Sequence, residues 1–125
     1  MEPLDPRPAS AVRTDLVDAL RNDLEAAGYT VAGVQALVGP MASAALGRER
    51  ALPALRATAD ARDALAVITR TFLLGRPTTR GALDAALRTL TADGAARLGL
   101  VEASGADDGD LVRPLLDVRP YEATD

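Results

Sequence analysis

The fold of this chain is decided by its second half, residues 61–118, which run ARDALAVITRTFLLGRPTTRGALDAALRTLTADGAARLGLVEASGADDGDLVRPLLDV. Apolar residues recur at helical spacing first, and strand-like alternation begins only after Gly99. The pattern predicts a helix, a second helix, a short third helix and then a two-stranded antiparallel hairpin. This order is typical of a winged helix, so we expect a winged-helix-like unit over residues 60–121.

Capping and breaking residues divide this half into its elements. They are Asp60, Gly75, Thr79, Thr91 and Gly99. Residues 100–103 and 111–113 are predicted to form the two strands, with residues 104–110 as the turn between them. Pro114 is expected at an edge or a bulge, because proline has no amide hydrogen to donate to a sheet.

The first half of the chain predicts short helices. Thr14 is a candidate N-cap for a helix over about residues 15–27, which carries leucines every four residues and stops at Gly28. Thr30 begins a second helix that ends at Gly39-Pro40, and the proline can open a third. We therefore expect a mostly helical chain, with helices over more than half of its length and one small antiparallel hairpin.

The domain organisation that follows has four parts. Residues 1–13, with three prolines among the first eight residues, are expected to be a flexible leader. Residues 14–59 are a helical preface, and residues 60–121 are the winged-helix-like unit. Residues 122–125 are either a frayed end or the start of a linker to a catalytic domain that these residues do not include.

The composition excludes several classes of chemistry. Histidine and cysteine are both absent from the 125 residues, which removes imidazole bases, thiolate nucleophiles, Cys/His zinc sites and disulfides. No glycine-rich phosphate or dinucleotide loop is present, and we identify no catalytic, cofactor-binding or metal-binding residue. The run Asp107-Asp108-Gly109-Asp110 lacks the ligand spacing of a calcium loop, so a solvated turn is the better interpretation.

The location of the chain is predicted from what its sequence lacks. The first residues contain no apolar segment like that of a signal peptide, and no run approaches the roughly 18 apolar residues that span a bilayer. We therefore expect a cytoplasmic protein without a membrane partner.

The predicted fold favours nucleic-acid binding, but the predicted distribution of charges does not. A winged helix places its last helix in the major groove of DNA, but residues 92–98 offer Arg97 alone, opposed by Asp93. The hairpin turn is acidic, and the net charge is −4. The charges thus argue against DNA binding, although a free-standing winged-helix DNA-binding transcriptional regulator stays as the alternative function.

Arginines mark a candidate surface for a partner. All 14 basic residues are arginine, and the candidate contact residues are four of those in the predicted winged unit, Arg76, Arg80, Arg88 and Arg97. Arg80 and Arg88 are expected on one helix, where eight residues leave them within about 40° of each other. The acidic hairpin turn is expected at the opposite pole. The alternative is an ordinary solvated surface, because arginines must be exposed somewhere.

A resemblance to a known family is carried by three stretches. They are LRNDLEAAGYTV at 20–31, AALGRE at 44–49 with LPAL at 52–55, and LGLVE at 98–102 running on to LDVRPY at 116–121. In their order these resemble the N-terminal region of actinobacterial class I S-adenosylmethionine-dependent methyltransferases, whose catalytic half is similar to that of the HemK-like group. The alanine and arginine bias also fits a GC-rich coding sequence.

The resemblance implies a role without chemistry for this chain. The family's methyl-donor loop and its Asn-Pro-Pro-Tyr type catalytic motif are not among these residues, so no catalytic residue of the family maps onto them. The expected function is a substrate-recognition or structural accessory domain, with S-adenosylmethionine bound by the parent protein. The implied partners are a covalently linked catalytic methyltransferase domain and an RNA or protein substrate that carries the target amine.

Overall fold

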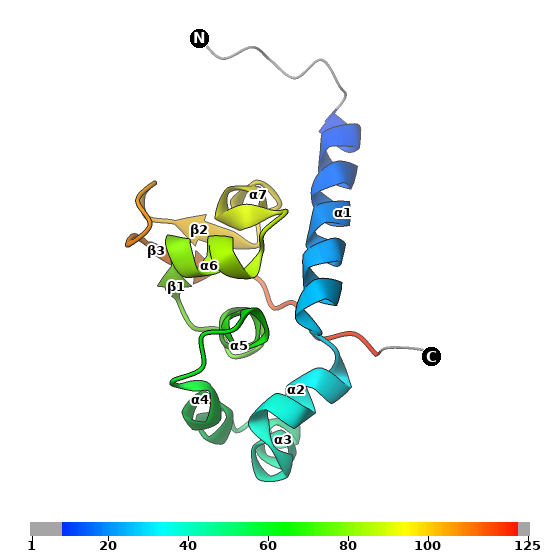
Figure 1. Ribbon diagram of the computed structural model, residues 1–125, viewed down its shortest axis with the longest axis vertical. Coiled ribbons are helices and arrows are strands. Elements are labelled where there is room, and N and C mark those ends of the chain that lie inside the picture. Colours follow the sequence, from blue (N-terminus) through cyan, green and yellow to red (C-terminus); the bar gives the residue numbers. More distant parts are fainter. Residues whose placement is uncertain (1–8, 123–125) are drawn as a thin grey trace.

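A computed structural model describes residues 9–122 of the chain. The first half is wholly helical apart from its connections (Figure 1). Its helices are α1 (Ala9–Ala27), α2 (Val31–Val38), α3 (Pro40–Gly47) and α4 (Leu52–Thr58). Helix α1 stands alongside the rest of the molecule, and α2, α3 and α4 gather at its C-terminal end (Figure 1).

The second half has the predicted winged-helix-like order, with one added strand. Its elements are α5 (Ala64–Ile68), the π-helical turn η1 (Thr69–Leu73), β1 (Thr78–Thr79), α6 (Arg80–Ala86), α7 (Thr91–Arg97), β2 (Val101–Ala103) and β3 (Leu111–Pro114). The strands form an antiparallel sheet in the order β1-β3-β2. The prediction of a mostly helical fold with a small antiparallel hairpin is therefore confirmed.

The extra strand escaped the sequence prediction because it is too short to show alternation. Only Thr78 and Thr79 form β1, and they pair with Val112 and Leu111. Strand β3 is thus the central strand, yet its Pro114 lies beyond the end of β1 and opposite Val101 of β2. At position 114 strand β3 has no β1 neighbour that would accept an amide hydrogen. Pro114 therefore lies at an open edge on the β1 side of the strand, as expected.

The first helix begins earlier than predicted. Residues 9–13 belong to α1, so the flexible leader over 1–13 and the N-cap at Thr14 are wrong for that part. Alanine and valine at positions 9, 11 and 12 are compatible with a helix, and the last proline of the leader precedes them at position 8. The remainder of the predicted leader, residues 1–8, lies outside the described residues, as do residues 123–125.

Local capping chemistry accounts for the confirmed boundaries. The Thr30 hydroxyl accepts the amide of Gly33 at 2.9 Å, and the Thr79 hydroxyl accepts that of Ala82 at 3.2 Å. Gly28 takes the positive φ of 73° that ends α1.

Two further predicted caps are wrong. The residue before α5 is Asp63, three positions after Asp60. Thr91 has a positive φ of 65°, which is unusual for a β-branched residue, and it forms the first residue of α7.

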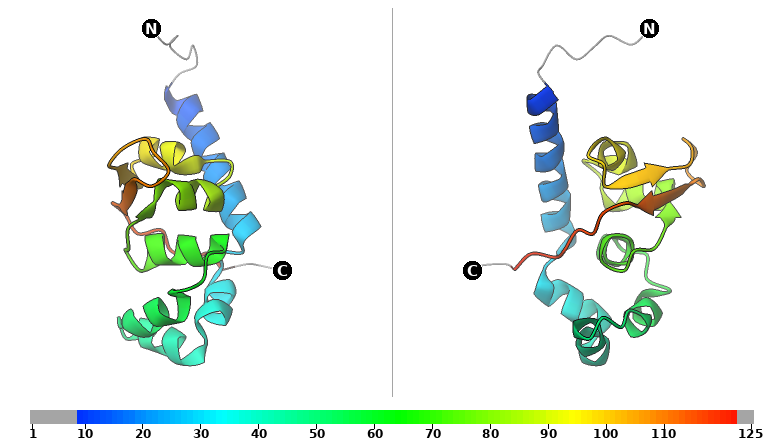
Figure 2. Two further views of the ribbon diagram at one scale, coloured as in Figure 1. Left: turned by 60° about the vertical axis from the view of Figure 1, so that its left-hand side comes forward. Right: turned by 180° about the vertical axis from the view of Figure 1, so that it is seen from behind.

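A single core joins the predicted preface to the winged unit. Buried side chains of α1, α2, α3 and α4 form one cluster with those of the second half, around Phe72 and Ile68. The chain then returns as residues 115–121, here named the C-terminal strap, which runs from the sheet past η1 to the turn between α1 and α2 (Figure 2, right). The boundary near residue 60 thus separates two segments of sequence that share one core.

Candidate partner-contact surface

The four arginines predicted as a contact surface come from four different segments of the winged unit. Arg76 is exposed in the connection between η1 and β1, and Arg88 is exposed in the turn after α6. Arg97 lies in the last turn of α7 with its side chain 65% exposed. Arg80, at the start of α6, is the exception because its side chain is 16% exposed.

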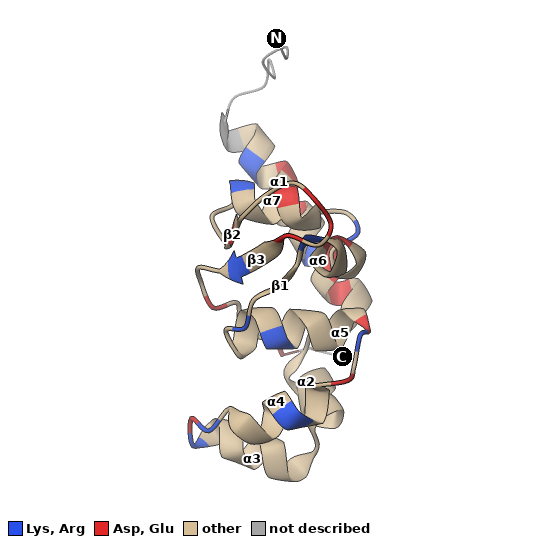
Figure 3. Cartoon of the chain, turned by 90° about the vertical axis from the view of Figure 1, so that its left-hand side faces the viewer, with Lys and Arg blue, Asp and Glu red and all other residues tan. Residues whose placement is uncertain are grey.

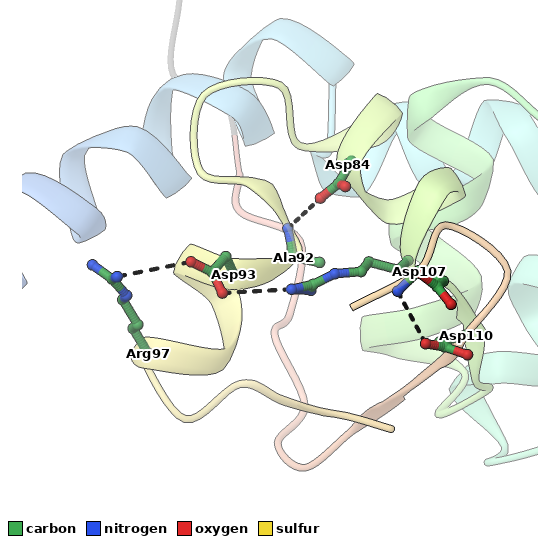
Figure 4. A network of polar contacts seen from close by, with 7 residues as sticks. Asp84, Ala92, Asp93, Arg97, Asp107 and Asp110 are labelled. Atoms are coloured by element: carbon green, nitrogen blue, oxygen red, sulfur yellow. Dashed lines mark hydrogen bonds and ion pairs between the residues drawn. The ribbon is translucent and has the colours of Figure 1, made fainter. Parts of the chain in front are cut away.

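Arg80 is committed to an internal contact. Its guanidinium lies 3.5 Å from the carboxylate of Asp93, which also pairs with Arg97 at 3.8 Å (Figure 4). The Nη1 atom of Arg80 is buried and has no hydrogen-bond partner among the described residues. The charge of Arg80 is thus already paired with Asp93, and its contact with a partner stays a prediction.

Arg88 does not share a helix with Arg80. Helix α6 ends at Ala86, and Leu87 leaves the helical conformation with ψ at 71°. The following amides bind carboxylates instead of continuing the helix, because Asp23 accepts those of Thr89 and Leu90. The expected alignment of the two arginines within about 40° is therefore wrong.

The acidic hairpin turn lies beside α6 instead of at an opposite pole. The amide of Arg80 donates to the carbonyl of Asp110 at 2.8 Å, and the amide of Gly81 donates to that of Asp108 at 2.9 Å. Asp110 also closes its own turn by accepting the amide of Asp107 (Figure 4). Basic and acidic groups thus alternate over this side of the winged unit (Figure 3). No group of acidic residues that could hold a metal ion occurs within residues 9–122.

Helix α7, which corresponds to the DNA-recognition helix of a winged helix, presents few groups to solvent. Ala92, Gly94 and Ala95 are buried. The exposed charged side chains of α7 are Asp93 and Arg97, which pair with each other. A helix with this surface has no unpaired cation to offer a phosphate or a base edge.

Helix α1 holds the turn that precedes α7. The carboxylate of Asp23 is 4% exposed and accepts the amide of Thr89 at 3.1 and 3.0 Å and that of Leu90 at 2.7 Å. Asn22 adds a hydrogen bond from its amide nitrogen to the Thr89 hydroxyl at 3.2 Å. Asp84 of α6 accepts the amide of Ala92 at 2.8 Å. Two carboxylates therefore fix the geometry between α6 and α7.

The C-terminal strap is anchored at a buried tyrosine. Tyr29 is fully buried, and its hydroxyl donates to the carbonyl of Val118. Burial raises the pKa of Tyr29 well above the ordinary value for tyrosine, and the negative charge of Asp117 adds to the rise. The amide of Val118 donates to the carbonyl of Phe72 at 3.1 Å, and the amide of Val31 donates to that of Tyr121 at 2.9 Å. The strap thus ties the start of α2 to η1.

Helix α1 and the strap enclose an apolar groove of about 390 Å³, here named the α1 groove. Its apolar lining consists of Val17, Leu20, Leu24 and Tyr121. Arg21, Glu25 and Arg119 supply the charged groups of its lining.

The sequence prediction missed this groove although it identified part of its lining. The leucines every four residues predicted helix α1, and one of them, Leu24, is buried. The available signal was an exposed aromatic residue, Tyr121, beside Arg119 near the end of the chain.

The chain belongs to a family described as a domain of unknown function, DUF7059, which matches residues 26–114. No curated protein and no solved structure matches the chain significantly. The matched segment runs from the end of α1 to the last residue of β3. Every residue that lines the α1 groove lies outside it. No helix within residues 9–122 is both long and apolar enough to cross a membrane.

Proposed function

We propose that this chain is a non-catalytic accessory domain of an S-adenosylmethionine-dependent methyltransferase that acts on an amine of a nucleic acid or a protein. In this role the domain holds or presents the substrate, or stabilises the catalytic half, while the catalytic half binds the methyl donor. The proposal starts from the resemblance of three stretches of the sequence to the N-terminal region of such enzymes.

One contact in the fold joins two of the stretches that carry the resemblance. The first stretch, residues 20–31, and the end of the third, residues 116–121, contact each other directly in the fold. The Tyr29 hydroxyl donates to the carbonyl of Val118, and Thr30 forms an isolated parallel bridge with Tyr121. Residues that resemble the family are thus the ones that anchor the strap, and a structural motif of this kind supports an accessory role.

Calorimetry tests the proposal. The 125-residue chain titrated with S-adenosylmethionine should give no binding heat, whereas the parent protein should bind the donor and transfer its methyl group. Micromolar binding by the 125-residue chain would contradict the proposed division of labour. A gene whose reading frame contains no methyltransferase half would remove the proposal altogether.

The alternative function, a free-standing DNA-binding regulator, is favoured by one observation, the winged-helix-like order of α5, β1, α6, α7, β2 and β3. Gel shifts at low salt separate the two functions, because a DNA-binding regulator binds with a steep dependence on salt concentration. The paired charges of α7 lead us to expect no shift.

A further inference from the structure

The dipeptide Asp-Gly occurs twice in this chain, as Asp93-Gly94 and as Asp108-Gly109. In such a dipeptide the glycine amide nitrogen can attack the aspartate side-chain carboxyl, because glycine has no Cβ that would hinder the approach. The reaction needs a backbone that can rotate and an amide that no hydrogen bond holds. The fold places the two dipeptides in opposite environments with respect to both requirements.

Asp108-Gly109 lies at the tip of the hairpin between β2 and β3. The two residues are the central pair of a turn that the Asp110 amide closes on the Asp107 carbonyl at 2.9 Å. Both are exposed, and within residues 9–122 the Gly109 amide and the Asp108 carboxylate have no hydrogen bond or ion pair. No described atom lies within 4 Å of the position that a Cβ of Gly109 would take. The attacking nitrogen and the attacked carboxyl are therefore both accessible.

Asp93-Gly94 carries the same two groups inside a helix. Gly94 is buried in α7, and a Cβ added to it would lie 2.7 Å from Leu90. The Asp93 carboxylate is paired with Arg80 at 3.5 Å and with Arg97 at 3.8 Å. The helical backbone keeps the Gly94 nitrogen from this carboxylate until α7 opens locally. The second dipeptide is thus an internal control for the first.

We propose that Asp108 is a site of spontaneous covalent modification, at which the peptide bond to Gly109 moves from the main-chain carboxyl to the side-chain carboxyl. The Gly109 nitrogen forms a bond to Cγ of Asp108. The bond from Cγ to its hydroxyl oxygen breaks, and this oxygen leaves as water with the proton of the amide. Water then adds to the main-chain carbonyl of the cyclic imide, the bond from that carbon to the nitrogen breaks, and isoaspartate results. Water is the only other reactant, and no electrons are exchanged.

The modification acts on the contact between the hairpin and α6. The main-chain carbonyl of Asp108 accepts the amide of Gly81 at 2.9 Å, and a Cβ added to Gly81 would lie 3.2 Å from that of Asp108. In isoaspartate this carbonyl becomes a carboxylate, and the main chain to Gly109 gains one carbon atom. A negative charge is then placed on the group that accepts the Gly81 amide, in the first turn of α6. The path of the turn changes while the net charge of the chain does not.

Incubation in water enriched in oxygen-18 tests the proposal. The 125-residue chain is held at mildly acidic pH and physiological temperature, and its peptides are analysed by mass spectrometry with electron-transfer dissociation. This fragmentation distinguishes aspartate from isoaspartate at each position, and each hydrolysis of the imide introduces one heavy oxygen. Both markers should accumulate at position 108 about 100-fold faster than at position 93, where α7 must first open.

Gly109→Val is the matched variant, because it leaves Asp108 in place and puts a branched side chain on the attacking residue. Gly109 does not have a positive φ, and its Cβ would lie in open space, so the variant should retain the fold, which circular dichroism checks. The branched side chain should slow the reaction at position 108 about tenfold. In urea the unaltered chain should react at positions 93 and 108 at rates within about twofold of each other, because the folded environments are lost.

Three results would overturn the proposal. Equal rates at positions 108 and 93 in the folded chain would show that the exposed turn does not select the site. An unchanged rate at position 108 in Gly109→Val would show that the Gly109 nitrogen is not the attacking group. A difference between the two positions that persists in urea would assign the selectivity to neighbouring residues and not to the fold.

Discussion

Replacing Asp23 by alanine should destabilise the protein more than any other single carboxylate replacement in α1. The carboxylate is 4% exposed and accepts the amides of Thr89 and Leu90 at distances between 2.7 and 3.1 Å. Hydrogen bonds to a charged group contribute about 1.5–3 kcal/mol, and leaving two amides unsatisfied adds to the loss. We therefore expect the free energy of unfolding to fall by about 3 kcal/mol, equivalent to roughly 10 °C in Tm.

Urea denaturation followed by circular dichroism measures this change. Asp18→Ala is the matched control, because Asp18 is exposed on the same helix and should change the free energy of unfolding by less than about 0.5 kcal/mol. Asp23→Asn keeps the size and one acceptor oxygen, so its loss should lie between the two. If Asp23→Ala were as stable as Asp18→Ala, the buried carboxylate would not hold the turn between α6 and α7.

Three further predictions follow from other contacts. The pKa of Tyr29 is higher in the folded state than in the unfolded chain, where it is about 10. The stabilisation is therefore complete at pH values below about 10, and the free energy of unfolding should fall as the pH rises above that value. Tyr29→Phe should flatten that decline in thermal melts, and an unchanged slope would exclude Tyr29 as its source. Arg80→Glu should lower the free energy of unfolding, measured by urea denaturation, by about 1–2 kcal/mol, because it places a second carboxylate beside Asp93. Arg88→Glu, in an exposed turn, should leave it unchanged. Equal effects of the two substitutions would contradict the ion pair between Arg80 and Asp93. Gly94→Val should lower the free energy of unfolding by about 2 kcal/mol, since an added Cβ would lie 2.7 Å from Leu90 Cδ1. The control is Gly47→Val, whose Cβ would lie in open space. Similar urea midpoints for the two variants would refute the close packing at Gly94.

Several helix boundaries predicted from local chemistry were right. Thr30 and Thr79 cap helices through their own hydroxyls, and Gly28 ends α1, because each effect depends on residues within a few positions. Asp60 and Thr91 also carry side-chain oxygens that can accept a backbone amide, but they do not cap a helix. At Thr91 the backbone has a left-handed conformation. The Thr91 amide donates a hydrogen bond to the Leu87 carbonyl at 2.7 Å, and the next amide, that of Ala92, donates to the carboxylate of Asp84.

The candidate contact surface could not be predicted to the same extent. The surface was inferred from the number and spacing of arginines. That spacing does not show where a helix ends when its following backbone amides bind a carboxylate from a distant part of the chain. Asp23 lies 66 positions before Thr89 in the chain. The hydrogen bond from the Thr89 amide to Asp23 accompanies the end of α6, and Arg88 therefore lies in a turn. The burial of Arg80 likewise depends on how α7 packs, since its partner Asp93 belongs to that helix.

Local sequence was sufficient for the order of the helices, the hairpin and the helix boundaries at Gly28, Thr30 and Thr79. These properties depend on hydrophobic periodicity and on hydrogen bonds within one turn of the chain. Only the tertiary structure decided that the preface and the winged unit share one core, that Arg80 pairs with Asp93 of α7, and that α1 and the strap enclose a groove. Each of these arises from contacts between residues far apart in sequence, where packing and not local propensity sets which side chains remain exposed.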